Sequence, residues 1–145
     1  MQRSVRKSSR SGQASVEALL VLMILGLVIF GGIELSQGIA LRQALDSGSS
    51  AAARALSLDP SQWTFAAGLV QQTVDQNGIG ISSPVTVRVF DAANSERSAA
   101  WLSGCPFGTS FRIEASAPFQ STIPFLNPSA VTIRVRHWGI VERYP

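Results

Sequence analysis

The sequence contains one cysteine, one histidine and few charged residues. A single cysteine excludes an intramolecular disulfide framework, and the scarcity of cysteine and histidine excludes a zinc finger and most metal sites with several ligands. Charged residues make up only 14% of the chain and hydrophobic residues 46%, which argues against a disordered chain and against an ordinary soluble domain. The 145 residues leave room for one modest globular domain.

Positive charge is concentrated in one short segment at the N-terminus. The first 12 residues hold no acidic residue and four of the 12 basic ones, namely Arg3, Arg6, Lys7 and Arg10. The rest of the chain holds 8 basic and 9 acidic residues, a net charge of −1. The net charge of the whole chain therefore gives little support to a nucleic-acid-binding function.

A long apolar run follows this basic segment. From Ala18 to Ile33 no residue has a polar side chain, and Glu17 and Glu34 stand at the two ends of the run. A bilayer core needs ~20 apolar residues, a length reached if the span extends to Leu41 with Glu34 at the outer interface. The pattern predicts a membrane span rather than a buried helix. The basic N-terminus is expected on the cytoplasmic side and the rest of the chain outside.

The helix is expected to continue well beyond the span. No proline occurs before Pro60, so one helix is predicted over residues 13–57, with a length of roughly 65 Å at ~1.5 Å per residue. Apolar residues in the second half follow steps of three and four, which places them on one stripe: Leu41, Ala44, Leu45, Gly48, Ala52, Ala55 and Leu56.

Two processing schemes fit the N-terminal segment. If the segment is a secretory signal peptide, the small-residue motif is Gly38-Ile39-Ala40. Cleavage then follows Ala40 and leaves a chain that begins at Leu41. Alternatively, cleavage follows Gly12, so that residues 1–12 are a leader and Gln13 is the first mature residue. Glu17 is then the fifth residue of the mature chain.

This arrangement resembles the type III signal of type IV pilins and pseudopilins. More specifically, the chain resembles the TadE-like minor pseudopilins of the tight-adherence (Flp, type IVc) pilus system. The residues that carry the resemblance are Gly12 with Glu17, Ile33-Glu34, Arg42-Gln43-Ala44 and Ala52-Ala53-Arg54-Ala55, with a looser likeness around Ile123-Pro124-Phe125-Leu126. One departure is Ala18, where many Flp-type members have an aromatic residue.

The resemblance implies a set of partners and roles. A prepilin peptidase would cut after Gly12 on the cytoplasmic side. The new α-amino group of Gln13 would pair with Glu17 of a neighbouring subunit, because an unpaired carboxylate at the edge of hydrocarbon costs several kcal/mol. This pair would set the register of packed helices. Glu34 is either a second residue of this kind or an interface residue that faces headgroups or water. The implied partners are other pseudopilins, the major pilin, the inner-membrane assembly platform and membrane lipid.

The segment after the long helix has the pattern of a small α+β head. Asp59 as N-cap, Pro60 at the first helical position and a later Asn77-Gly78 stop predict a second helix over residues 60–76. Period-two alternation predicts strands over residues 85–90, 111–117 and 131–136, with a short fourth strand at 79–81. Residues 91–109 are expected to be a long connection, and Pro118, Pro124 and Pro128 to keep 118–128 out of a central strand.

The fold class expected is therefore α+β and pilin-like: a long N-terminal transmembrane and amphipathic helix, a second helix and a three- to four-stranded antiparallel sheet. The domain organisation expected is a leader over residues 1–12, the long helix over 13–58 and an external head over 59–145. The head's stability is expected to depend on packing against the amphipathic half of the long helix.

Candidate sites in the head give no indication of catalysis. If the strands pair in register, four arginines share the polar face of the sheet: Arg88, Arg112, Arg134 and Arg136. Such a face suits a solvated surface or contact with another subunit better than a polyanion, and Glu114 interrupts its positive charge. Cys105 could bridge two chains or stay a free thiol. His137 has neither a nucleophile-elbow pattern nor metal-ligand spacing around it, so no catalytic residue, metal or cofactor is expected.

The function favoured is that of a structural and assembly protein: a TadE-like minor pseudopilin that matures at Gln13, waits in the bacterial inner membrane and takes part in assembly or initiation of an adhesive pilus. Two alternatives stay open, a secreted binding domain with an ordinary signal peptide and an uncleaved membrane anchor with an external head. The N-terminal residue of the mature protein distinguishes the three.

Overall fold

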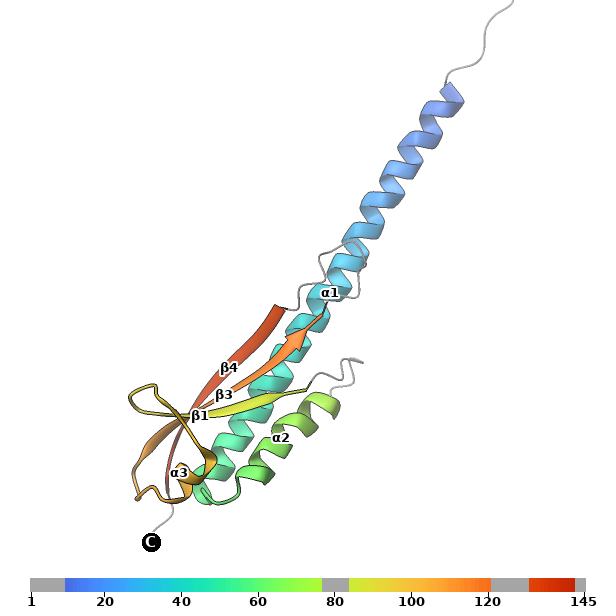
Figure 1. Cartoon of the computed structure of the whole chain (residues 1–145). Helices are drawn as coiled ribbons and strands as arrows, with labels where there is room; N and C mark the ends of the chain where they lie inside the picture. The colour runs from blue at the N-terminus through green and yellow to red at the C-terminus, as the bar shows by residue number, and fades with distance from the viewer. Residues whose placement is uncertain (1–9, 77–83, 121–130, 143–145) are drawn as a thin grey trace, which may run out of the picture.

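A long helix followed by a small α+β head makes up the chain (Figure 1). The computed structural model describes residues 10–76, 84–120 and 131–142. Its elements are, in chain order, α1 (Arg10–Leu58), α2 (Trp63–Gln76), β1 (Thr86–Asp91), β2 (Glu96–Arg97), α3 (Ala99–Ser103), β3 (Ser110–Phe119) and β4 (Val131–Ile140). The α+β fold predicted from the sequence, with its long first helix, is confirmed.

Helix α1 is continuous over 49 residues, as the absence of proline predicts. Its N-terminal half projects beyond the head, and its C-terminal half packs into the head (Figure 1). The predicted apolar stripe is confirmed, except that Ala55 is only half-buried; Ser49 and Ala53 are buried as well. The Ser49 hydroxyl donates a 2.6 Å hydrogen bond to the carbonyl of Leu45, so this buried polar group is satisfied within the helix.

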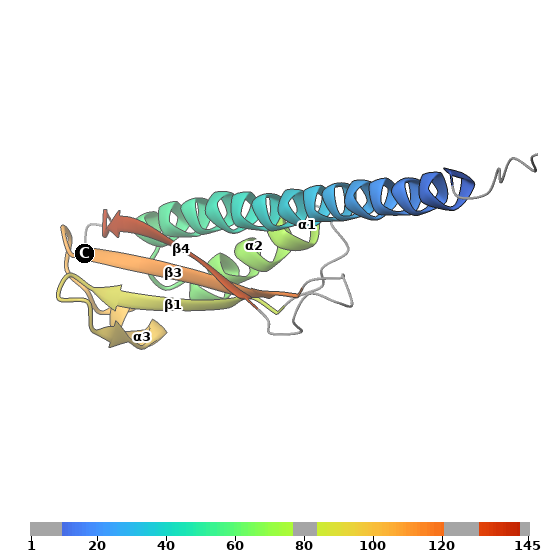
Figure 2. The same ribbon diagram turned by 90° about the horizontal axis from the view of Figure 1, so that it is seen from above.

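The sheet has the order β2-β1-β3-β4, and every neighbouring pair is antiparallel. Its inner face packs against α1 and α2, and α1 runs alongside β3 and β4 (Figure 2). Alternate residues of the central strand β3 face the helices, as period-two alternation requires: Phe111, Ile113, Ala115 and Ala117 are buried. The three strands predicted by alternation are thus confirmed, and β4 extends four residues further, to Ile140.

One hydrophobic core joins the long helix to the head. It contains Leu45 and Leu56 of α1, Val70 of α2, and Phe111 and Ile113 of β3. The two helices come close at Gly48, where an added Cβ would lie 3.0 Å from the Cα of Val70. The head therefore buries its apolar face against the amphipathic half of α1, which fits the dependence expected from its small size.

The predicted start of the second helix is wrong by three residues. Pro60 is not helical, and α2 begins at Trp63. The Asp59 carboxylate caps a turn before the helix: it accepts hydrogen bonds from the Ser61 backbone N–H (3.1 Å) and from the Gln62 side-chain amide (2.9 Å). An aspartate that binds backbone two residues further on forms an Asx turn, which competes with capping a helix directly.

Two further expectations about the head need correction. The connection expected over residues 91–109 begins after Asp91, which ends β1, and it contains the short strand β2 and the helix α3. Pro118 lies in the central strand β3, paired with Thr132 of β4. It is tolerated because β1 pairs with β3 only as far as Ser116, so that Pro118 lies beyond the end of the β1–β3 ladder. The strand expected at 79–81 and the motif at 123–126 lie outside the described residues.

Candidate functional site

The N-terminal half of α1 exposes a continuous apolar surface. Large apolar side chains from Val16 to Ile39 have exposed fractions of 49 to 67%. Within the described part of the chain, α1 is the one helix long and apolar enough to cross a membrane. An apolar surface of this extent is unstable in water, so the helix requires lipid or other apolar helices around it.

The three residues predicted to take part in processing lie at the start of α1. Gly12 is in its first turn, and an added Cβ there would meet no atom within 4 Å. The side-chain amide of Gln13 donates a 3.2 Å hydrogen bond to Glu17, one helical turn further on. The structure thus brings Gln13 and Glu17 together on one face. Nothing in the described part of the fold requires glycine at position 12.

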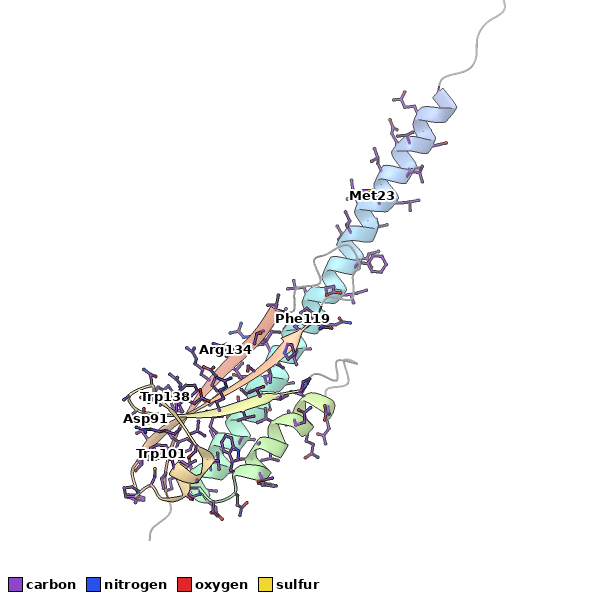
Figure 3. The ribbon with its side chains drawn as sticks, viewed as in Figure 1. Met23, Asp91, Trp101, Phe119, Arg134 and Trp138 are labelled. Atoms are coloured by element: carbon purple, nitrogen blue, oxygen red, sulfur yellow. The ribbon has the colours of Figure 1, made fainter. Side chains whose placement is uncertain are left out.

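Glu34 lies where α1 meets the head. It is half-buried and lines a cavity of about 390 Å³ whose other residues are Leu35, Gly38, Ile39, Arg42, Phe119 and Ile133. Phe119, at the end of β3, lies beside α1 (Figure 3), and its ring is 3.9 Å from where a Cβ on Gly38 would stand. The predicted span therefore ends at the point where the head begins to cover the helix.

The four arginines predicted on one face of the sheet do share it. The register pairs Arg88 with Glu114 across β1 and β3, and Glu114 with Arg136 across β3 and β4. Arg136 and Arg134 both bind the Glu114 carboxylate, at 2.8 and 3.2 Å. Arg88 binds Glu96 of β2 at 3.2 Å. Three of the four arginines are thus engaged by carboxylates of the same face.

Arg112 is held by aromatic rings on this outer face. Its guanidinium carbon lies 4.7 Å from the centre of the Phe90 ring and 5.6 Å from that of Trp138, distances typical of cation–π contacts. One guanidinium nitrogen also donates a hydrogen bond to the side-chain carbonyl of Asn94. Trp138 itself has an exposed fraction of 59%. Phe90, Arg112 and Trp138 thus form a partly exposed aromatic and basic cluster on the outer face of the sheet.

A polar cluster that is not among the sites predicted from the sequence lies at the turn between β1 and β2. Asp91 is nearly buried, and its carboxylate accepts a 2.8 Å hydrogen bond from the Ser95 backbone N–H and a 2.8 Å bond from Arg97 Nε. The turn is closed by Asn94, whose φ of 63° is in the left-handed region that asparagine tolerates. The pair Asp91 and Asn94, three residues apart, is the turn signal from which the hairpin could have been predicted.

The hydrogen bond from the Ser95 backbone, helped by Arg97, holds the pKa of Asp91 below its usual range, although partial burial acts in the opposite direction. A carboxyl with a depressed folded-state pKa stabilises the fold above its unfolded-state pKa, and this stabilisation is lost as pH falls through the folded-state value. We expect Asp91→Asn to lower the melting temperature by several degrees at pH 7 and to have a smaller effect near pH 3. Thermal unfolding at both pH values measures this.

Asp75→Asn provides the control for this prediction, because Asp75 is exposed on α2 and its partner is the Gln71 side chain. This variant should unfold close to the wild-type temperature at pH 7. An Asp91→Asn variant as stable as the wild type at pH 7 would show that the turn does not depend on this carboxylate.

Cys105 and His137 have structural contacts. The thiol of Cys105 is half-buried and donates to the carbonyl of Trp101 at 3.3 Å, and burial raises the pKa of this thiol. His137 Nε2 lies 2.9 Å from the Asp46 carboxylate, which joins β4 to α1. His137 therefore has a structural role, because its contact with Asp46 links the sheet to the helix. Whether Cys105 bridges two chains stays a prediction.

The comparisons with known proteins agree with the resemblance seen in the sequence. A family model described as TadE-like protein matches residues 12–54. Searches of curated proteins and of solved structures found no match for the chain. The matched segment begins at Gly12 and ends in the part of α1 that packs into the head, so it covers the exposed apolar half and most of the buried stripe. The N-terminal helical segment of this chain is therefore similar to that of TadE-like proteins.

Proposed function

We propose that the chain is a minor pseudopilin that takes part in assembly or initiation of a tight-adherence pilus. The observation that carries the proposal is the coincidence of the TadE-like match with a helix whose first half is apolar and exposed. A pilus subunit uses such a helix at two stages. The helix first holds the subunit in the membrane, and it later packs against the helices of other subunits. The head then provides the surface that other subunits contact.

Processing is proposed to occur between Gly12 and Gln13. The bond lies in the first turn of α1, where helix ends fray and a peptidase can gain access. The basic leader stays in the cytoplasm, α1 spans the inner membrane and the head lies outside. Once the leader is removed, the new α-amino group of Gln13 is available to Glu17 of a neighbouring subunit. In the uncleaved chain, the Gln13 side chain already contacts Glu17.

The partners follow from this role: a prepilin peptidase, a second minor pseudopilin, the major pilin and the assembly platform of the inner membrane. Lipid surrounds α1 until the subunit enters the pilus. Neither a cofactor nor a catalytic residue is part of the proposal. Glu34 is proposed as a second register residue, since it lies half-buried at the outer end of the span.

A cut near Ala40 by signal peptidase is the main alternative, and the helix geometry disfavours it. Gly38 and Ala40 lie in the interior of α1, and Gly38 faces the ring of Phe119. Proteolytic sites are commonly exposed and poorly ordered, whereas this segment is helical and close to the head. Cleavage here would also remove the whole apolar half that the TadE-like match covers.

The test is the N-terminus of the protein purified after co-expression with a prepilin peptidase. Intact mass spectrometry should show a chain that begins at Gln13. A chain that begins at Leu41 would support the secreted domain, and one that keeps Met1 or Gln2 would support the uncleaved anchor. Either of these two results overturns the proposal of pseudopilin processing.

A further inference from the structure

The foot of the head, where α1 leaves it, combines apolar and basic groups. We use this name for Leu35, Ile39, Arg42, Phe119, Ile133 and Arg134. The apolar cavity of about 390 Å³ is lined by five of these residues, and a second cavity of about 440 Å³ is lined by Arg42 and Arg134 together with Asp46, Val135 and Arg136. Arg42 belongs to both cavities. Figure 3 shows Phe119 beside α1 and Arg134 on the neighbouring strand β4.

The position of Arg42 along α1 matches the phosphate level of a bilayer. If hydrocarbon begins just after Glu17, a core about 30 Å thick takes ~20 helical residues and ends near Gln37. The polar headgroup layer adds roughly 5–7 Å on each side, which is about three to five more residues of helix. Arg42 then lies among the headgroups, while Leu35 and Ile39, exposed by 67 and 49%, lie at the edge of the hydrocarbon.

In the described part of the chain, the ion pairs do not match each basic group of the foot with a carboxylate of its own. Among the described residues no carboxylate lies within ion-pair distance of Arg42. Arg134 shares the single carboxylate of Glu114 with Arg136, so the two guanidinium groups exceed their partner by one charge. Asp46 also lines the second cavity, and its carboxylate lies 2.9 Å from His137 Nε2. Glu34, two turns before Arg42, also lines the apolar cavity.

We infer that the foot of the head binds the headgroup of an anionic phospholipid. Arg42 and Arg134 donate hydrogen bonds to the lipid phosphate, and Phe119 and Ile133 contact its glycerol and upper acyl chain. A free phosphate would leave the apolar cavity next to Arg42 unfilled, whereas a phospholipid occupies both cavities. This contact fixes the height and tilt of the head on the membrane before the subunit enters a pilus. The inference rests on the membrane insertion that the proposed function includes.

The experiment measures which lipids stay with the full chain. The protein is reconstituted in nanodiscs with equal amounts of phosphatidylcholine and phosphatidylglycerol, and retained lipid is counted by native mass spectrometry. We expect phosphatidylglycerol to be retained over phosphatidylcholine. Each basic residue near an anionic surface changes this ratio about fivefold. Arg42→Gln and Arg134→Gln should each lower the ratio by about that factor.

Arg54→Gln is the matched control, because Arg54 is exposed on the same helix three turns further from the membrane. It should leave the ratio of retained phosphatidylglycerol to phosphatidylcholine unchanged. An equal fall in this ratio in the Arg54→Gln variant would show that lipid retention depends only on the total charge of the chain. Equal retention of the two lipids by the wild-type chain overturns the inference, as does displacement of the lipid by millimolar inorganic phosphate.

Carbonate extraction of the same samples separates this inference from the proposed function. A chain that is extracted from the bilayer has not inserted, which overturns both. A chain that stays inserted but shows no preference for phosphatidylglycerol overturns only the anionic-lipid site.

Discussion

Replacing Gly12 with valine or alanine is expected to leave the basic leader attached to the protein. In the proposed cleavage after Gly12, the residue before the cut fits a peptidase subsite that accepts glycine, and we expect a side chain at this position to obstruct it. When the Gly12→Val variant is co-expressed with a prepilin peptidase, intact mass should show the complete chain, whereas the wild-type chain should begin at Gln13. A fall in processing of at least about a hundredfold corresponds to ~2.7 kcal/mol in the barrier to cleavage.

The structure makes this test specific to the peptidase. An added Cβ at Gly12 meets no atom within 4 Å, so the substitution does not disturb packing within the chain. Alanine in place of glycine also favours a helix by about 1 kcal/mol, and unfolding of α1 therefore cannot explain a loss of processing in the alanine variant. A Gly12→Val protein that matures normally at Gln13 would remove the basis for the proposed cleavage site.

Gly26→Val is the control for the effect of the Gly12 substitution on peptidase recognition and for its effect on the packing of α1. Gly26 lies in the same exposed part of α1, and an added Cβ there also meets no atom within 4 Å. This variant changes the same residue type on the same helix, but outside the leader. It should mature as the wild-type chain does. If it also keeps its leader, the defect lies in membrane insertion rather than in recognition of the cut site.

How much of the fold the sequence predicts depends on how local each signal is. The absence of proline and the steps of three and four in α1 are local, and they place the whole helix and its buried stripe correctly. Period-two alternation places β1, β3 and β4 for the same reason. The start of α2 is misplaced because Asp59 suits either an N-cap or an Asx turn, and its neighbours Ser61 and Gln62 favour the turn.

The features that the sequence does not predict depend on contacts between distant segments. Strand β2 has only two residues, which is too short for alternation to show, and it exists because it pairs with β1. From the sequence, Glu114 is expected only to interrupt the basic face. In the structure both Arg134 and Arg136 bind its carboxylate, so Glu114 determines how the positive charge of that face is neutralised. The foot of the head is likewise formed by residues from three elements, α1, β3 and β4, which are distant in the sequence.

Among the glycines that the structure describes, Gly139 is the one at which alanine is expected to destabilise the head most. Gly139 of β4 is paired directly with Phe111 of β3, and the Phe111 ring is fully buried over the glycine. An added Cβ would lie 2.9 Å from both Cε atoms of Phe111 and closer still to its Cζ atom. This overlap requires the ring or the strand to move, and overpacking of this kind costs about 1–3 kcal/mol.

The free energy of unfolding of Gly139→Ala, measured by urea denaturation of the full chain in detergent, checks this prediction. Tryptophan fluorescence follows the transition, since the three tryptophans, Trp63, Trp101 and Trp138, all lie in the head. Gly68→Ala is the control: Gly68 is exposed on α2, and an added Cβ meets no atom within 4 Å. That variant should be unchanged or more stable by up to about 1 kcal/mol, because alanine favours the helix.

A second substitution shows whether the Phe111 ring is the cause. Phe111→Leu removes the ring atoms that an alanine side chain at position 139 would meet, so Gly139→Ala should cost less in that background than in the wild-type chain. The difference between the two costs is the coupling energy of the pair, and for residues in direct contact it is expected to be about 0.5–3 kcal/mol. Equal costs in the two backgrounds would mean that glycine is needed for the conformation of β4 itself. Because β4 carries both His137 and Arg134, a shift of this strand to relieve the overlap would also move the contacts that join the sheet to α1 and to the foot of the head.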